Sequence, residues 1–146
     1  MKKIFNLSIA FFILITAHAQ KSPVFVTDGA AIHGYDAVAY FTQAKAIKGD
    51  SSISYNWNNA NWYFVSRENK ELFKSAPEKY APQYGGYCAY GLSAGHKAPT
   101  DPQAWMVVDG KLYLNYSKGV QQVWIKKQQE FIDKANTNWP TLKDKE

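Results

Sequence analysis

The chain has 146 residues, a formal net charge of +5 at neutral pH and a single cysteine. One cysteine excludes an internal disulfide, so apolar packing has to stabilise the fold. The lysines are scattered and form no arginine-rich stripe, which argues against nucleic-acid binding. Aromatic residues make up 16% of the chain, and this favours a small sheet-containing domain with an aromatic interior.

The first residues read MKKIFNLSIAFFILITAHAQ, a pattern typical of an export signal. Two lysines precede an apolar run over residues 7–15, and Ala-His-Ala at 17–19 fits a cleavage site. The run is shorter than the roughly 20 residues of a membrane span, and no cysteine stands at the cleavage point to carry a lipid. We therefore predict that residues 1–19 are removed, and that the mature chain is periplasmic or secreted without a membrane anchor.

The mature chain is expected to form one domain over residues 34–142. A leader over residues 20–33 precedes the domain, and a charged tail over residues 143–146 follows it.

The stretch ISYNWNNANWYFVS predicts the first hairpin of the domain. Ile53, Tyr55 and Trp57 alternate on one strand face, the turn runs over residues 58–60, and a second strand follows over residues 62–65.

Ser66 comes directly after this hairpin, and its side chain can cap a helix. Apolar residues then recur about one helical turn apart, at Leu72, Phe73, Ala76 and Tyr80. Pro77 predicts the start of a second helical turn, since proline does not continue a helix.

The stretch AWMVVDGKLYLNY predicts a second hairpin, because Asp109-Gly110 suits a tight type I′ turn. Ser117 then caps a longer helix, which we expect to end near Trp139 because Pro140 restricts the residue before it. The apolar face of that helix comprises Val120, Val123, Trp124, Phe131 and Ala135. These elements predict an α+β fold of short antiparallel hairpins, a short middle helix and a longer C-terminal helix.

Several segments in a fixed order resemble the YHS-domain family. They are GYDAVAYF, WYFVSRENKELFKSAPEKYAPQYGGYCAYG, DPQAWMVVDGKLYLNYS and the closing NWP, and they span residues 34–142. The resemblance implies a small α+β domain related to cysteine-rich metal-binding modules. It implies no settled activity.

Those related modules carry cysteines at the positions of Val65, Asn69 and Ala39 in this chain. None of these three residues can act as a thiolate ligand. The metal site of the related modules is therefore not expected here.

Cys88, in the segment GGYCAYG, has three possible roles. It can be a buried, packed side chain, a soft metal ligand beside Gly85 and Gly86, which permit close backbone approach, or a redox-active or nucleophilic thiol. His33 and His96 could complete a copper or zinc site with it, although the spacing matches no recognised ligand motif. The alternative for each histidine is an ordinary surface loop residue.

Four further residues are candidate ligand contacts: Asp36, Tyr40, Trp62 and Tyr87. Asp36 can instead brace a turn through its carboxylate, and Trp62 can be a core residue of its strand. The tyrosines beside Cys88 can wall a pocket.

The function expected from these features is a small exported binding domain for a metal ion or a small ligand. The alternative is an interaction module that presents exposed tyrosines and tryptophans to another exported protein. A cysteine-based enzyme using Cys88, His96 and Asp36 is a third class, without a recognised catalytic motif to support it.

Overall fold

The computed structural model describes residues 23–145, and the predicted export signal over residues 1–19 lies outside them. The strands are β1 (Val26–Thr27), β2 (Ala30–Ala31), β3 (Asp50–Trp57), β4 (Ala60–Phe64), β5 (Asp101–Val108) and β6 (Lys111–Asn115). The α-helices are α1 (Ala39–Thr42), α2 (Arg67–Ser75), α3 (Pro77–Tyr80), α4 (Ala89–Ser93), α5 (Lys118–Lys126) and α6 (Gln128–Leu142). There are also two 3-10 helices, η1 (Ile32–Gly34) and η2 (Gln83–Gly86). Among these elements, no helix combines the length and apolar character needed to span a bilayer.

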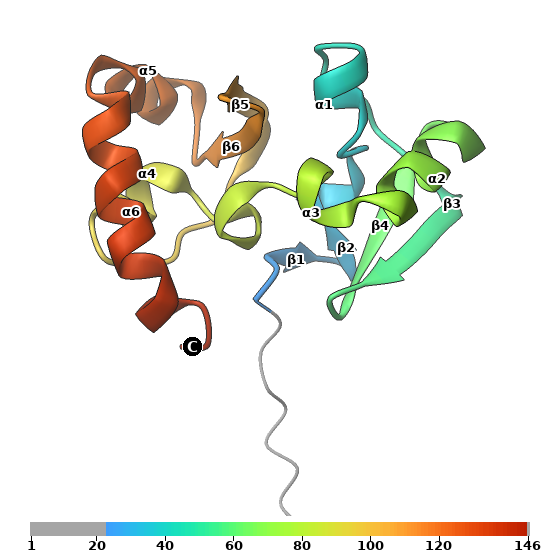
Figure 1. Ribbon diagram of the computed structural model, residues 1–146, viewed down its shortest axis with the longest axis horizontal. Helices are drawn as coiled ribbons and strands as arrows, with labels where there is room; N and C mark the ends of the chain where they lie inside the picture. Colours follow the sequence, from blue (N-terminus) through green and yellow to red (C-terminus); the bar gives the residue numbers. More distant parts are fainter. Residues whose placement is uncertain (1–22, 146) are drawn as a thin grey trace, which may run out of the picture.

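The strands form two small sheets, and the predicted α+β class is confirmed. One sheet has the order β1-β2-β4-β3, with antiparallel outer pairs and a parallel contact between β2 and β4. The other is the antiparallel pair β5-β6. In Figure 1 the first sheet lies with α1, α2 and α3 on one side of the molecule, and β5 and β6 lie with α4, α5 and α6 on the other.

Both predicted hairpins are confirmed. Trp57 pairs with Ala60 across a two-residue turn in which Asn58 and Asn59 have positive φ. Val108 pairs with Lys111 across the Asp109-Gly110 turn, in which both residues also have positive φ. Positive φ at both turn residues matches the right-handed twist of the flanking strands.

Local sequence signals also set the helix starts. Ser66 Oγ accepts the N–H of Asn69 at 3.1 Å at the start of α2, and Ser117 Oγ accepts the N–H of Val120 at 3.2 Å at the start of α5. Pro77 is the first residue of α3, as predicted.

The C-terminal helix differs from the prediction. Lys127 has φ −137° and ψ 42°, so α5 and α6 are two helices rather than one. The second helix passes through Pro140 instead of ending near Trp139. Pro140 is exposed and lies in the last turn of α6, where the missing N–H removes a single ladder hydrogen bond. Val123 is 46% exposed, because α5 buries the opposite face.

Residues 23–33 form part of the fold, whereas the sequence placed them in a leader. Val24 and Ile32 are buried in the core, and the strands β1 and β2 pair with each other. The Phe25 N–H donates to Gly85 O at 2.8 Å. The described residues of the predicted tail, 143–145, are exposed.

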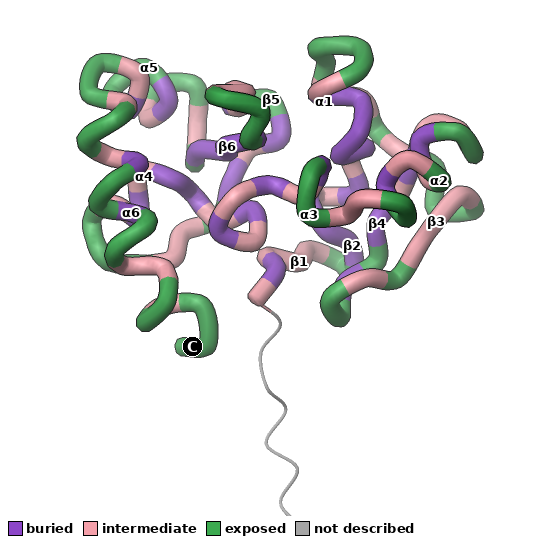
Figure 2. Tube along the Cα trace, in the orientation of Figure 1, coloured by how far each residue is buried: buried purple, intermediate pink, exposed green. Residues whose placement is uncertain are grey.

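Two clusters of buried side chains lie on opposite faces of β6. The sheet core lies among the first sheet, α1 and α2 and includes Tyr40, Trp62, Phe64 and Phe73. The helix core includes Trp124, Ile132 and Ala135. Alternate residues of a strand point to opposite faces, so Leu112 and Leu114 enter the sheet core while Tyr113 enters the helix core. Figure 2 shows β6 and α4 buried, whereas much of α6 faces outward.

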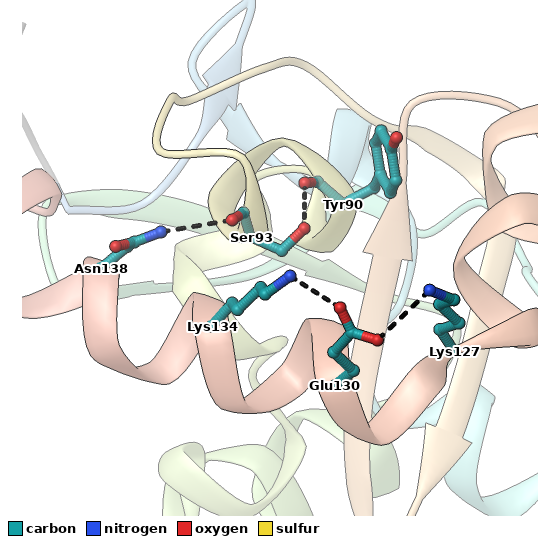
Figure 3. A network of polar contacts seen from close by, with 6 residues as sticks. All are labelled: Tyr90, Ser93, Lys127, Glu130, Lys134 and Asn138. Atoms are coloured by element: carbon teal, nitrogen blue, oxygen red, sulfur yellow. Dashed lines mark hydrogen bonds and ion pairs between the residues drawn. The ribbon is translucent and has the colours of Figure 1, made fainter.

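Polar contacts fix α4 against α6. Asn138 Nδ2 of α6 donates to Leu92 O at 2.9 Å and to Ser93 O at 3.4 Å, at the C-terminal end of α4. Figure 3 shows Asn138 pointing at Ser93, while the ion pairs of Glu130 with Lys127 and Lys134 run along the exposed side of α6. The helix core is thereby closed by α6.

Candidate functional site

Cys88 joins the start of α4 to the end of β6. It is the N-cap residue of α4 and is 1% exposed. Its Sγ accepts the N–H of Gly91 at 3.4 Å and that of Tyr116 at 3.2 Å. The thiol also lies 3.8 Å from Asn115 Oδ1. These contacts favour a packing and capping role for Cys88 over a ligand role.

The two histidines are not assembled with Cys88 into a metal centre. His33 Nε2 donates to Thr100 O at 2.7 Å, and its ring packs edge-on against Phe25. His96 is an exposed residue of the loop after α4. Across residues 23–145, no group of three or more His, Cys, Asp and Glu side chains is arranged to hold a metal ion. The copper or zinc site expected from Cys88, His96 and His33 therefore has no preformed ligand cluster in this part of the chain.

Asp36 is an internal brace. Its side chain is fully buried, and Oδ1 accepts the N–H groups of Val38 at 2.8 Å and Ala39 at 3.2 Å. Oδ2 accepts the Val65 N–H at 2.9 Å and Asn69 Nδ2 at 2.7 Å. The carboxylate thus ties the start of α1 to the junction between β4 and α2, which is the bracing role weighed for it from the sequence.

The same contacts bring together three positions that the resemblance singles out. Ala39, Val65 and Asn69 all donate to the Asp36 carboxylate, two through backbone N–H groups and one through a side-chain amide. A hydrogen-bonded carboxylate lies where these three positions meet. This arrangement satisfies buried donors and contains no thiolate.

Tyr40 connects the two halves of the molecule. Its hydroxyl donates to Pro102 O at 2.9 Å, and its ring packs edge-on against Trp105 at 5.1 Å between centroids. Burial raises the pKa of Tyr40 well above the ordinary value of 10.0. Tyr40 also borders a shallow groove with Phe41, Trp105 and Met106, but its hydroxyl is directed to the protein backbone.

Tyr87 is half-buried beside the N-terminal segment. Its ring lies 5.3 Å from that of Phe25 and 6.4 Å from that of Trp139, and Lys97 Nζ lies 5.0 Å from its centre. Burial raises the pKa of Tyr87. Tyr87 therefore packs against Trp139, which lines an aromatic cleft.

Trp62 lies at an aromatic cleft of about 340 Å³. The cleft is lined by residues of the N-terminal segment, the β3–β4 hairpin, α3, η2 and the end of α6. Its aromatic lining comprises Trp57, Trp62, Tyr84 and Trp139. Volumes of roughly 300–1,000 Å³ with apolar walls are typical of small-molecule sites.

The polar lining of the cleft is sparse. Glu78 supplies a carboxylate, Lys143 an ammonium group, and Asn58 and Gln83 supply amides. Trp62 is 1% exposed, and its Nε1 donates to Trp57 O at 3.0 Å. The cleft therefore has a rigid aromatic floor and a few polar groups, an arrangement suited to binding and orienting a small organic molecule.

The sequence pattern indicated Trp62 as a candidate ligand contact, but it did not indicate most of the other residues that line the cleft. Trp139 was treated only as a helix end, and Glu78 and Lys143 carried no signal. Gly85 was recognised as permitting close approach, and it does so: a Cβ at this position would lie 1.8 Å from Pro23 O. The cleft begins at the Gly-Gly part of the predicted segment and extends away from Cys88.

No protein-family model matches the chain, and comparisons with curated proteins and with solved structures also found no match.

Proposed function

We propose that this chain is a small exported binding domain of YHS type whose ligand is a small organic molecule bound in the aromatic cleft. The observation that carries the proposal is the cleft itself, in which Trp57, Trp62 and Trp139 line one space. Two of these residues come from the β3–β4 hairpin and the third from α6. The ligand would therefore contact both halves of the fold.

The distribution of aromatic side chains supports a ligand site over an interaction module. An interaction module was expected to expose tyrosines and tryptophans. All five tryptophans lie within the described residues and none of them is exposed, while Tyr116 is the one exposed tyrosine there, at 57%. Most of the aromatic surface is thus directed inward or into clefts.

The contacts of Cys88, Asp36 and His96 give little support to a metal site or an enzyme. Cys88 and Asp36 are buried and hydrogen-bonded to different elements, and His96 is exposed in a loop. A nucleophile, base and orienting group must contact one another to act together. The hydrogen-bond partners of Asp36 are Val38, Ala39, Val65 and Asn69, and those of Cys88 are Gly91, Asn115 and Tyr116.

Binding can be tested with three isosteric probes and the mature protein, beginning at Gln20. The probes are choline, the neutral alcohol 3,3-dimethylbutan-1-ol and the anion 3,3-dimethylbutanoate, titrated at millimolar concentration while tryptophan fluorescence is followed. We expect saturable binding of at least one probe, and loss of that binding in Trp139→Ala, because this substitution removes one wall of the cleft.

Tyr116→Ala is the matched control, since it removes an exposed aromatic ring that does not line the cleft. It should bind like the wild type. Circular dichroism and thermal melting establish that each variant is folded. Absence of saturable binding for all three probes, or equal binding by folded Trp139→Ala, would contradict the proposed function.

A further inference from the structure

We infer that the aromatic cleft selects an organic cation, with a quaternary ammonium group as the best fit. This inference rests on the proposed function, because it names the chemical class of the ligand in the same cleft. Three features of the lining favour a positive charge on the ligand: the indole rings, the single carboxylate and the end of α6.

The indole rings provide the first feature. A cation is attracted to the face of an aromatic ring, most strongly to that of tryptophan, by the ring quadrupole. Trp57 and Trp139 are half-buried and present ring surface to the cleft, whereas Trp62 is 1% exposed and donates its one N–H to Trp57 O, so it supports the Trp57 wall from below. Trp62 also packs on Phe73, with 4.8 Å between ring centroids, which holds the floor of the cleft in place.

The charges around the cleft provide the second and third features. Glu78 is the one acidic residue in the lining. Trp139 and Lys143 lie at the C-terminal end of α6, a helix of 15 residues, and the C-terminal end of a helix carries partial negative charge. Both the carboxylate and the helix end attract a cation, and the Lys97 ammonium, which donates to Lys143 O at 2.9 Å, offsets part of the charge of the helix end.

Lys143 is the one basic residue in the lining, and it opposes a bound cation. It is exposed, and its charge is carried on a flexible stem that can turn toward solvent. The indole walls have no such freedom because they are packed. We therefore expect Lys143 to reduce the affinity for a cation without reversing the preference.

The lining also distinguishes between classes of cation. A calcium or magnesium ion requires several oxygen ligands, and the cleft offers one carboxylate. Aromatic faces instead suit a large, weakly hydrated cation whose charge is spread over methyl groups. A trimethylammonium head has this character.

The test compares choline with 3,3-dimethylbutan-1-ol, which has the same shape and no charge. In the mature protein we expect choline to bind at least about fivefold more tightly than the alcohol. Glu78→Gln should weaken choline binding by about two- to fivefold and Lys143→Gln should strengthen it by a similar factor, while each changes the affinity for the uncharged alcohol less than the affinity for choline.

Glu68→Gln and Lys126→Gln are the matched controls, because each neutralises an exposed helical charge outside the cleft lining. They should leave choline binding unchanged.

The cation assignment is overturned if the alcohol binds as tightly as choline or more tightly. It is also overturned if the Glu78 and Lys143 variants do not change choline binding in opposite directions. If the alcohol binds as tightly as choline or more tightly, and Trp139→Ala abolishes that binding, the proposed function stands while the cation class fails. If no probe binds, both fail.

Discussion

The Asp36 carboxylate shows how one side chain holds the sheet core together. Four N–H donors from two separate stretches of chain, at the start of α1 and at the junction of β4 and α2, converge on it, and no lysine or arginine is among them. Hydrogen bonds to a charged acceptor are stronger than those between neutral groups. Loss of this acceptor would leave several buried donors unsatisfied, which is costly.

Asp36→Asn should therefore lower the free energy of unfolding by about 2–4 kcal/mol, because the new NH₂ group faces two N–H donors. Urea denaturation measures the change. Asp50→Asn is the control: Asp50 is exposed, and its carboxylate accepts the N–H of the nearby Ser52. If the urea midpoint of Asp36→Asn lies as close to that of the wild type as the midpoint of Asp50→Asn does, the bracing role is refuted.

Only part of the Asp36 contact set could be predicted from the sequence. A carboxylate that braces its own turn is a local feature, and the bonds to Val38 and Ala39 are of this kind. The partners Val65 and Asn69 lie 29 and 33 residues away. No pattern along the chain shows that they meet Asp36, since this depends on how α2 packs.

At the scale of elements, features set by neighbouring residues were predictable and the others were not. Asp109-Gly110 defined its turn, and Ser66 and Ser117 defined helix starts, because the signal and the structure involve the same few residues. The break at Lys127 has no comparable signal. It allows α5 and α6 to pack on the helix core in different directions.

The contact between η2 and the N-terminal segment depends on a missing side chain. Gly85 has φ +61°, and an added Cβ would lie 1.8 Å from Pro23 O. Gly85→Ala should lower the free energy of unfolding by about 3 kcal/mol or more, because it combines a steric clash with backbone strain. It should also weaken probe binding, since Pro23 and Gly85 both line the cleft.

Gly110→Ala separates these two effects. Gly110 has φ +71° but no atom within 4 Å of the added Cβ, so only the backbone strain, about 1 kcal/mol, is expected. Thermal or urea unfolding of the two variants compares them directly. Equal losses in Gly85→Ala and Gly110→Ala would show that the close approach to Pro23 does not matter.

At the scale of the whole molecule, the cleft arises from segments that are distant in the sequence. Its lining comes from residues 23–24, the β3–β4 turn, residues 78–85 and the end of α6. The sequence indicated an aromatic domain and a Gly-Gly close approach, but not that Trp57 and Trp139 line one cleft. Their convergence depends on the placement of the sheet core and the helix core on either side of β6.

Buried tyrosines in both halves make the fold sensitive to alkaline pH. Burial raises the pKa values of Tyr40, Tyr84, Tyr87 and Tyr113 above the ordinary 10.0. Above pH 10 the unfolded chain releases these protons while the folded chain retains them, so the unfolded state is favoured as pH rises. Their contribution to stability is therefore fully present below about pH 10 and is lost above it.

The expected result is a free energy of unfolding that falls steeply between about pH 9 and pH 12. The double variant Tyr40→Phe/Tyr84→Phe should show a shallower fall, because it removes two of the groups whose pKa is raised. Urea unfolding at a series of pH values measures the slope. Tyr116→Phe, at an exposed tyrosine, is the control and should keep the wild-type slope. An unaltered slope in the double variant would contradict this account.

The most direct test of the aromatic cleft as the binding site uses the indole N–H signals of the five tryptophans in two-dimensional NMR spectra. Trp57, Trp62 and Trp139 line the cleft, whereas Trp105 and Trp124 do not, so the protein contains its own internal controls. Assignment by single Trp→Phe substitutions precedes titration of the protein from Gln20 with choline and, in separate titrations, with 3,3-dimethylbutan-1-ol and 3,3-dimethylbutanoate. The account predicts saturable shifts of the Trp57, Trp62 and Trp139 signals, while those of Trp105 and Trp124 stay in place. Shifts confined to Trp105 or Trp124, or no shift of any indole signal, would contradict it.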